Sequence, residues 1–266
     1  MLTLTIILVC AVLGMSVGFM AGLLGIGGGL IIVPALVYLL PLFGIESELV
    51  MPIALATSLA AIVVTSSSAA FAHHKNGNIP WHIAKPLMVA VSIGALAGSF
   101  IADLLPAKTL TSFFAATVMI LAAYMLISIK VERTKPYPKQ WKVNTIGVGT
   151  GVIASLMGIS GGVILIPTLS YLSIQVRQAI GTATACGLMV ALFGSLGFIF
   201  TGLNQTNLPP WSVGYIYLPA LLGITLTSFL FAPVGVKLAT KLPVRTLKKL
   251  FAGFLILVAI EMLVSS

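Results

Sequence analysis

The stretch Gly25-Ile-Gly-Gly-Gly-Leu-Ile-Ile-Val-Pro34-Ala-Leu36 decides how this chain is organised, because the chain contains it twice. The second copy, Gly158-Ile-Ser-Gly-Gly-Val-Ile-Leu-Ile-Pro167-Thr-Leu169, aligns with the first without a gap. Further matches follow in the same order: Ala56-Thr57-Ser58 with Gly181-Thr182-Ala183, Pro80-Trp81 with Pro210-Trp211, and Leu105-Pro106 with Leu242-Pro243. Such self-similarity indicates duplication of a unit of about 130 residues.

The composition predicts that this duplicated unit lies in a membrane. Of the 266 residues, 59% are hydrophobic and 7% are charged, which leaves too little polar surface for a water-soluble domain. The chain is a series of apolar stretches separated by short polar breaks, and an apolar stretch of about 20 residues spans a bilayer as a helix. Residues 110–129 do not alternate apolar and polar side chains as the strands of a membrane barrel do, so the surrounding solvent is lipid and the fold is helical.

Each half contains five apolar segments. We place them at 4–24, 27–42, 50–72, 83–104 and 109–129 in the first half, and at 143–157, 160–174, 178–202, 212–236 and 245–265 in the second. The first repeat therefore occupies residues 1–130 and the second residues 143–266, with a basic cytoplasmic linker over 131–142. Because five is odd, the halves face opposite sides of the bilayer. The predicted fold is an all-α membrane protein with two inverted five-segment repeats, each with a Gly-rich broken-helix hairpin followed by three transmembrane helices.

The segments beside the second glycine motif are short for membrane spans. Residues 143–157 and 160–174 supply about 15 residues each, or about 22 Å of helix against a hydrocarbon core of about 30 Å. We favour a helical hairpin that enters and returns on one side, with its glycine-rich tip at depth. Two short tilted spans are the alternative, and either version returns the chain to the side from which it came.

The net charge of +9 is assigned to membrane topology. Basic residues gather in two linkers, 130–142 and 237–249, and basic residues that flank membrane helices mark the cytoplasmic side. This pattern favours a topology signal over a nucleic-acid site, so nucleic acid is not expected as a partner.

Placing the first basic linker in the cytoplasm determines the side of every other loop. His73–Lys75 and Arg177 then lie in the cytoplasm as well. The parts expected outside are both termini, Glu46, Glu48 and the uncharged loop 204–207. Lys108 departs from the positive-inside rule, and Asp103 lies close to it in the sequence.

The glycine-rich tips are the strongest candidates for a binding site. Backbone groups that leave a helix inside the bilayer must be buried in protein or line a wet cavity, and a stretch such as 25–29 would break a helix there. A helix that restarts after the glycines offers free N–H groups with a partial positive charge, which bind anions without a charged side chain. Two such tips from oppositely oriented halves would converge near the midplane, as in inverted-repeat secondary transporters that work by alternating access.

The segment after each tip adds hydroxyl groups that can hydrogen-bond the oxygen atoms of a solute. The predicted substrate-binding residues are Gly25, Gly27, Gly28, Gly29, Thr57, Ser58, Gly158, Ser160, Gly161, Gly162, Thr182 and Thr184. For Ser and Thr the alternative role is hydrogen bonding to their own helix or a neighbouring one. For glycines it is tight helix packing, which we expect of Gly14-xxx-Gly18, Gly94-xxx-Gly98 and Gly147-xxx-Gly151. Duplication favours binding at the motif glycines, because short Gly-interrupted segments in corresponding positions mark transporter sites.

Other reactive side chains favour a carrier over an enzyme. His73, His74 and His82 lack a carboxylate or Cys partner, so a solvated loop is favoured over a metal site and no metal or other cofactor is predicted. Cys10 and Cys186 lie in apolar segments, where a disulfide framework is not expected. A membrane-embedded enzyme would need a nucleophile or an acid–base pair facing a cavity. Two alternatives stay open: a carrier of thiosulfate or sulfide that uses Cys186 as a relay thiol, and a carrier of carboxylate anions.

At the two Gly/Pro motifs, together with Ala56-Thr57-Ser58 and Leu105-Pro106, the chain resembles the sulfite exporter TauE/SafE (TSUP) family of bacterial and plant membrane proteins. The resemblance covers essentially the whole length. It implies a multi-pass protein of the bacterial inner (cell) membrane that exports small inorganic or organic anions, such as sulfite, organosulfonates or carboxylates, as a secondary carrier. Protons are a candidate coupling ion.

The two halves depart from one another at the predicted site. Ser160 stands where the first copy has Gly27, and Ala183 stands where the first half has Ser58. We therefore expect the halves to contribute unequally to one site.

Overall fold

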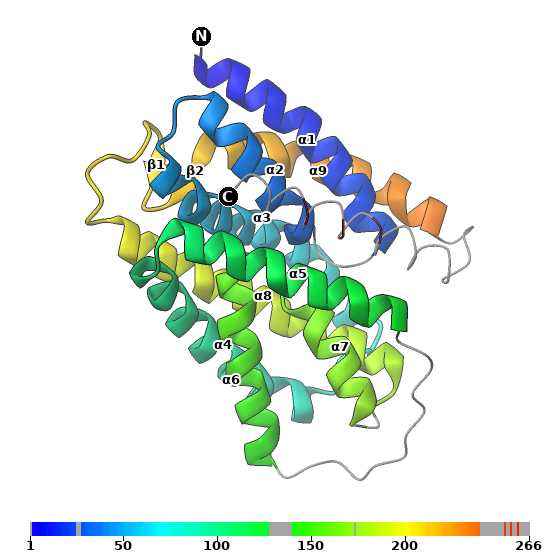
Figure 1. Cartoon of the computed structure of the whole chain (residues 1–266). Helices are drawn as coiled ribbons and strands as arrows, with labels where there is room; N and C mark the ends of the chain where they lie inside the picture. Colours follow the sequence, from blue (N-terminus) through cyan, green and yellow to red (C-terminus); the bar gives the residue numbers. More distant parts are fainter. Residues whose placement is uncertain are drawn as a thin grey trace.

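The structure is a computed structural model that describes residues 2–24, 28–127, 140–172 and 174–239, together with residues 253, 256 and 260. These residues form a bundle of helices with one short hairpin (Figure 1). The helices are α1 (Leu2–Leu24), α2 (Gly29–Leu42), α3 (Ser47–Lys75), α4 (Trp81–Leu104), α5 (Ala107–Ile127), α6 (Gln140–Leu156), α7 (Gly162–Tyr171), α8 (Val176–Gly202) and α9 (Leu218–Ala239). The strands β1 (Ser212–Val213) and β2 (Ile216–Tyr217) pair antiparallel.

These helices match the first nine predicted segments in order, which confirms the all-helical prediction over the described ranges. The predicted start of the segment 212–236 is wrong, because the chain first forms the hairpin and α9 begins only at Leu218. Its cause is a backbone bend, since Trp211 and Gly214 have φ of 69° and 54°, outside the helical region. The tenth predicted segment, 245–265, lies outside the described residues except at 253, 256 and 260, which are helical.

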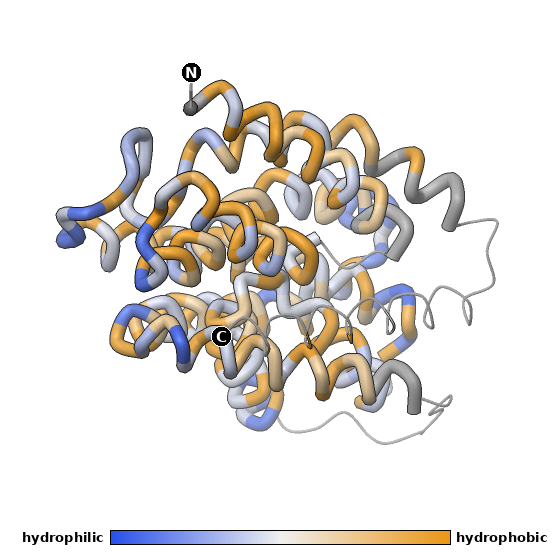
Figure 2. The backbone as a smooth tube through the Cα atoms, turned by 45° about the horizontal axis from the view of Figure 1, so that its top comes forward, coloured by the Kyte–Doolittle hydropathy of each residue, from blue (hydrophilic) through white to orange (hydrophobic). Residues whose placement is uncertain are grey.

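The described helices have the hydropathy of membrane helices. Of these helices, α3, α4 and α8 are long and apolar enough to cross a membrane. Apolar residues run along the helices, and hydrophilic residues gather in the connecting loops (Figure 2). By contrast, α2 and α7 contain 14 and 10 residues, or about 21 and 15 Å of helix, less than a hydrocarbon core of about 30 Å. The two helices that follow the glycine motifs are therefore too short to span alone.

Glycines bring two pairs of helices into close contact. On α1, a Cβ added to Gly18 would collide with the backbone of Ser228 in α9. On α6, a Cβ added to Gly151 would collide with the carbonyl oxygen of Val91 in α4. Contacts of this kind are typical of small residues in membrane helix interfaces. The packing prediction is confirmed for Gly14, Gly18, Gly94, Gly98, Gly147 and Gly151.

Each of the two close pairs joins one helix from the first half of the sequence to one from the second. Helix α1 packs on α9, and α6 packs on α4. The predicted repeat matches α6 with α1 and α4 with α9. Helices α3 and α8 lie between these pairs and pack on one another (Figure 1). They run in opposite directions, since Leu59 contacts Gly194, whereas Asn78, beyond the end of α3, contacts Gly181 near the start of α8. The core thus centres on two antiparallel helices, one from each half.

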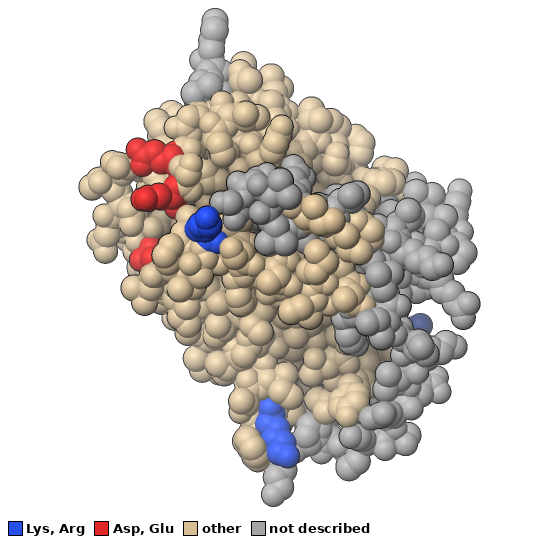
Figure 3. Space-filling view, in the orientation of Figure 1, with Lys and Arg blue, Asp and Glu red and all other residues tan. Residues whose placement is uncertain are grey.

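Charged side chains separate the two ends of the bundle. The acidic side chains in view gather where the hairpin lies (Figures 1 and 3). We call this the acidic end; among the described residues it carries Glu46, Glu48, Asp103 and Lys108. The opposite, basic end carries the first turns of α4, α6 and α8 and the last turn of α3, with the described cations Lys75, Lys85, Lys142 and Arg177.

Candidate functional site

The two glycine motifs have the same local structure. Gly28 and Gly161 directly precede α2 and α7 and have φ of 77° and 69°, a left-handed conformation that glycine adopts without strain. The carbonyl oxygen of each accepts hydrogen bonds from the N–H groups three and four residues later. The predicted restart of a helix at each motif is therefore confirmed. Gly25 and Gly27 lie outside the described residues.

The starts of these helices expose backbone donors inside the protein. Among the described residues, the N–H groups of Gly29 and Leu30, and those of Gly162 and Val163, make no hydrogen bond to one another or to other groups. The first N–H groups of any helix lack intrahelical partners. Gly29 and Leu30 are buried, whereas Gly162 and Val163 are half-buried. Unpaired buried N–H groups are rare in proteins, so the Gly29 and Leu30 donors, which have no acceptor in the described part of the chain, are candidates to bind one.

The two motifs meet one another. A Cβ added to Gly29 would lie 2.5 Å from the carbonyl oxygen of Gly158 and 3.1 Å from the Cα of Ile159. The Ser58 hydroxyl, from α3, donates a hydrogen bond of 2.7 Å to the same Gly158 oxygen. We call the set Gly28, Gly29, Ser58, Gly158 and Ile159 the tip junction. It joins both motifs to a central helix, and only glycine fits at its closest approach.

The motifs reach the central helices far from either end of the bundle. Ser58 lies 11 residues after Ser47, about 16 Å from the acidic end of α3 and about 26 Å from its basic end. A Cβ added to Gly187 in α8 would lie 2.8 Å from the carbonyl oxygen of Ser160. Gly187 lies 11 residues after Val176, again about 16 Å from the nearer helix end. Both tips therefore lie at depth.

The equivalent threonines Thr57 and Thr182 are both fully buried, with 0% of their surface exposed. The Thr57 hydroxyl oxygen accepts a hydrogen bond of 3.1 Å from the N–H of Tyr217 in β2. The Thr182 hydroxyl has no hydrogen-bond partner among the described residues. Burying a hydroxyl without a partner costs about 1–3 kcal/mol, so Thr182 is a polar group that the fold leaves unsatisfied.

The remaining predicted residues, Ser160, Gly162 and Thr184, differ in whether they are free to bind a solute. Ser160 is 9% exposed and packs on Gly187; its hydroxyl makes no hydrogen bond to a described residue. A Cβ added to Gly162 would lie 3.6 Å from the Ser160 Oγ. The Thr184 hydroxyl donates to the carbonyl oxygen of Ile180 in its own helix. Thr184 is thus occupied in the way that Ser and Thr commonly are in membrane helices, and Ser160 is free to bind.

The sequence did not predict the two segments that cover Thr57 and the neighbour of Thr182. The hairpin Ser212–Tyr217 covers Thr57 from the acidic end. The loop 76–80 reaches α8 from the basic end, where the carbonyl oxygen of Asn78 abuts Gly181, the neighbour of Thr182. The repeated Pro-Trp pairs were the available signal, since Trp81 follows the loop and Trp211 precedes the hairpin.

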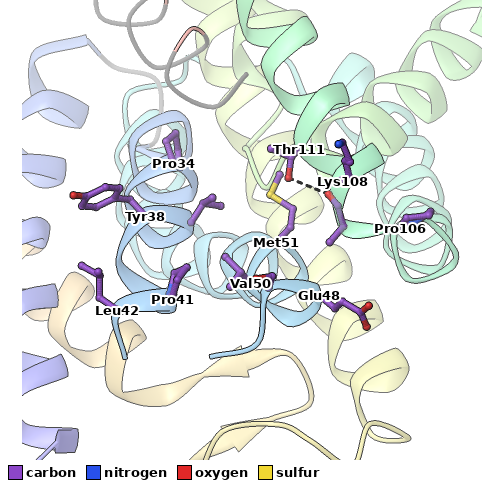
Figure 4. Close-up of a pocket in the computed structure, with 13 residues that line it drawn as sticks. Pro34, Tyr38, Pro41, Leu42, Glu48, Val50, Met51, Pro106, Lys108 and Thr111 are labelled. Carbon is purple, nitrogen blue, oxygen red and sulfur yellow. Dashed lines mark hydrogen bonds between the residues drawn. The ribbon is translucent and has the colours of Figure 1, made fainter. Parts of the chain in front are cut away.

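A pocket of about 720 Å³ lies at the acidic end between α2, the start of α3 and the start of α5 (Figure 4). Its walls are mostly apolar, and its two charged groups, Glu48 and Lys108, have opposite signs. Met51 lines it, and Leu55, one helical turn further along α3, packs against Gly158. The pocket therefore approaches the tip junction, but its charges do not select an anion.

Among the described residues, no group of three or more His, Cys, Asp or Glu side chains could hold a metal ion. What the site offers is backbone donors, two free hydroxyls and a close glycine contact at depth. Apolar helices that break at depth, with backbone donors beside the break, are typical of helical membrane transporters.

Comparison with known proteins identifies the family. The chain belongs to the family described as "Sulfite exporter TauE/SafE", whose profile matches residues 10–262. A Haemophilus influenzae protein named "Probable membrane transporter protein" is 42% identical, over 97% of this chain and 98% of the relative. The Bacillus subtilis "Probable membrane transporter protein YdhB" is 28% identical, over 91% of this chain and 93% of its own. No solved structure matches. The chain is a membrane transporter and not an enzyme.

Proposed function

We propose that the chain is a secondary transporter that exports sulfite or an organosulfonate anion by alternating access of two inverted halves around the tip junction. The observation that carries this proposal is the meeting of two motifs at depth, each of which starts a helix whose first N–H groups have no acceptor among the described residues. Family membership supports the substrate class, since the family is described as a sulfite exporter family.

The chemistry of the junction supports an anion. Its described members carry no charged side chain, and the described acidic residues Glu46, Glu48 and Asp103 lie at one end of the bundle. Helix N-termini bind anions through their N–H groups and the partial positive charge of the helix. The unpaired hydroxyls of Thr182 and Ser160 are suitable donors to sulfite or sulfonate oxygen atoms. These donors hydrogen-bond an anion without fixing it by a full charge, which permits release.

The packing supports two inverted repeats, 1–130 and 143–266. The equivalent helices α3 and α8 run antiparallel, and each half contributes one helix to a close pair with the other half. Because α2 and α7 are too short to span alone, a hairpin that returns at the tip is the version that we favour. Rocking of such halves around a fixed site is the usual form of alternating access.

The charge distribution supports an orientation with the basic end in the cytoplasm of a bacterial cell and the acidic end outside. Lys75, Lys142 and Arg177 lie at the basic end, in agreement with the positive-inside rule. In this orientation the cytoplasmic end attracts anions and the outer end repels them. The field thus favours loading inside and release outside.

Flux into and out of proteoliposomes tests the proposal. Sulfite, sulfate, an organosulfonate and a carboxylate are compared with and without a pH gradient, and sulfite or organosulfonate flux above that of empty liposomes is expected. Gly161→Val should reduce flux to background, because it places a branched side chain at a φ of 69°. Gly149→Ala is the matched control, since nothing lies within 4 Å of a Cβ added there. Flux of the carboxylate alone would make the protein a carboxylate carrier, and no anion flux from folded protein would overturn the proposal.

The thiosulfate or sulfide carrier is the second candidate. Cys186 is fully buried in α8 and directly precedes Gly187, against which Ser160 packs. A relay thiol would make flux of these sulfur species depend on Cys186, so Cys186→Ala should abolish it. Sulfite flux that survives Cys186→Ala would assign the cysteine to packing.

A further inference from the structure

The hairpin Ser212–Tyr217 interrupts the likeness between the halves. In the first half, α4 begins directly at Trp81, whereas in the second half α9 begins at Leu218, seven residues after Trp211. The additional residues form the hairpin at the acidic end (Figure 1). A structure present in one half alone points to a task that the halves do not share.

The backbone of the hairpin is docked on the end of α8. A Cβ added to Gly214 would collide with the carbonyl oxygen of Ile199, and a Cβ added to Gly202 would collide with the N–H of Tyr215. The same N–H donates to the carbonyl oxygen of Phe198 at 3.3 Å. Glycine is required on both sides of this contact, so the hairpin is seated closely on the helix.

One side-chain pair ties the hairpin to α4. The Tyr215 hydroxyl donates a hydrogen bond of 2.8 Å to Asp103 Oδ1, in the last turn of α4. The Tyr215 ring packs edge-on against Phe198, with 6.3 Å between ring centroids. Hydrogen bonds to a charged acceptor are stronger than neutral ones, so this pair is the strongest side-chain tie of the hairpin among the described residues.

The second strand of the hairpin, β2, reaches the candidate site through Tyr217. The N–H of Tyr217 donates to the hydroxyl oxygen of Thr57, and the next residue of α3, Ser58, donates to Gly158 in the tip junction. Adjacent residues of α3 thus bind the hairpin and the tip junction. Thr57 is fully buried beneath it.

We propose that the hairpin Ser212–Tyr217 is the outer lid of the transport site, and that Asp103 and Tyr215 are positioning residues that hold the Tyr217 N–H on Thr57. This inference rests on the proposed function, because a lid matters only where a solute passes. Opening breaks the hydrogen bonds of Tyr215 and Tyr217 and exposes the face of α3 that carries Thr57.

The chain has a hinge at the start of the lid. Trp211 has a φ of 69°, which is an unusual conformation for a bulky residue, and strained residues gather at switch regions. Its carbonyl oxygen accepts a hydrogen bond of 3.1 Å from the N–H of Leu218, the first residue of α9. The two ends of the lid are therefore held together, and the lid can turn about them as a unit.

Thiol accessibility tests the lid. The chain has two cysteines, so Cys10→Ala with Cys186→Ala gives a cysteine-free background. Ala54→Cys then places a reporter on α3, one turn from Thr57 on the same side, where Ala54 is fully buried. A membrane-impermeant thiol reagent applied to the acidic end should label this reporter slowly, and Tyr215→Phe or Asp103→Ala should raise the labelling rate about tenfold or more.

Conservative variants distinguish positioning from general loosening. Asp103→Asn keeps an acceptor oxygen without the charge and should label at a rate between those of the background and Asp103→Ala. Thr57→Ser keeps its acceptor oxygen and should label at nearly the background rate, whereas Thr57→Val should label fast. Tyr38→Phe is the matched control for Tyr215→Phe, since Tyr38 is exposed. Equal rates for Thr57→Ser and Thr57→Val, or fast labelling before any lid substitution, would overturn the lid. Asn204→Cys, in an exposed loop at the same end, reports that the reagent has access.

Labelling needs no substrate, so failure of the lid and failure of the proposed function are distinguishable. If the labelling pattern follows the hydrogen bonds while no anion flux is found, the proposed function is wrong and the hairpin still closes an outer route. If flux is found while labelling ignores these substitutions, the transporter stands and the lid is wrong. Under the lid proposal, Tyr215→Phe should also change the maximal flux more than the half-saturating concentration, because the bound anion does not contact Tyr215.

Discussion

Thr57 and Thr182 hold equivalent places in the two halves, and their surroundings differ. Each is fully buried in a central helix, beside a connection that reaches the helix from one end of the bundle. Thr57 binds that connection through the Tyr217 N–H, whereas the Thr182 hydroxyl has no partner in the described part of the chain. The two equivalent positions therefore differ: the Thr57 hydroxyl is bonded to the hairpin, whereas the Thr182 hydroxyl is the one that we propose to bind a solute.

The glycines that open the two short helices show the same divergence. A Cβ at Gly29 would meet Gly158 at 2.5 Å, whereas a Cβ at its counterpart Gly162 meets only Ser160 Oγ, at 3.6 Å. The first motif is thus pressed against the second, while the second has space beside it. Ser58 reinforces this contact from the first half, and Ala183 has no hydroxyl to do so from the other.

The largest effect on stability is expected from alanine at Gly29, the glycine in close contact with Gly158. Gly29→Ala should cost about 2–3 kcal/mol of stability, because the new methyl group overlaps backbone that cannot move away, and flux should be lost. Gly162→Ala should change stability by less than about 1 kcal/mol, because a contact of 3.6 Å is ordinary. Thermal unfolding in detergent measures both. Equal losses at the two positions would contradict the difference between the motifs.

A smaller loss is expected when Ser58 is given the residue of the other half. Ser58→Ala removes the 2.7 Å hydrogen bond to Gly158 and should cost about 1–2 kcal/mol, since the buried carbonyl loses its partner. Ser67→Ala is the control, because Ser67 is an exposed residue of α3 that bonds its own helix; its effect should stay within about 0.5 kcal/mol. A Ser58→Ala protein as stable as this control would show that the junction does not depend on the bond.

Substituting valine for Thr57 and for Thr182 should distinguish a hydroxyl that stabilises the fold from one that binds the anion. Thr182→Val removes an unsatisfied buried hydroxyl, so it should stabilise the fold by about 1 kcal/mol while raising the half-saturating anion concentration about tenfold. Thr57→Val should destabilise instead, because the Tyr217 N–H loses its acceptor. Unfolding curves and flux saturation curves of the two variants give both quantities. If Thr182→Val leaves anion affinity unchanged, Thr182 does not bind the substrate.

The smallest effect concerns pH at the hairpin. Burial, and then the hydrogen bond to Asp103, raise the pKa of the Tyr215 hydroxyl above its usual range. A pKa that folding raises contributes stability below the unfolded-state pKa of about 10, and this contribution is lost only as pH rises through the folded value. Labelling rates rise with pH for any cysteine because the thiolate is the reactive form, so the rate beneath the hairpin is divided by that of the exposed Asn204→Cys reporter. This ratio should stay flat from about pH 6 to 9, and a rise in the ratio within that window would show that another group controls the hairpin.

Much of this architecture was predictable because it depends on local patterns. Helix positions followed from apolar length, the break at Gly28 and Gly161 from glycine content, and the close packing of Gly18 and Gly151 from small-residue spacing. The hairpin was not predictable, since the apolar run after Trp211 has the composition of a helix and its bend is imposed by contacts with α8. The partners of Thr57 and Ser58 lie 160 and 100 residues away, and such distant pairings leave no trace in local composition.

The pairing of α1 with α9 also sets a timetable for biogenesis. α1 is synthesised first, and its glycine face fits a helix that begins about 200 residues later; at about 5–20 residues per second the ribosome needs roughly 10–40 seconds to reach it. During that interval α1 lies in the bilayer or against the insertion machinery without its partner, whereas α6 finds α4 already made. The newly made chain can therefore pack α6 on α4 before α1 finds α9, and truncation before α9 would remove the main packing partner of α1.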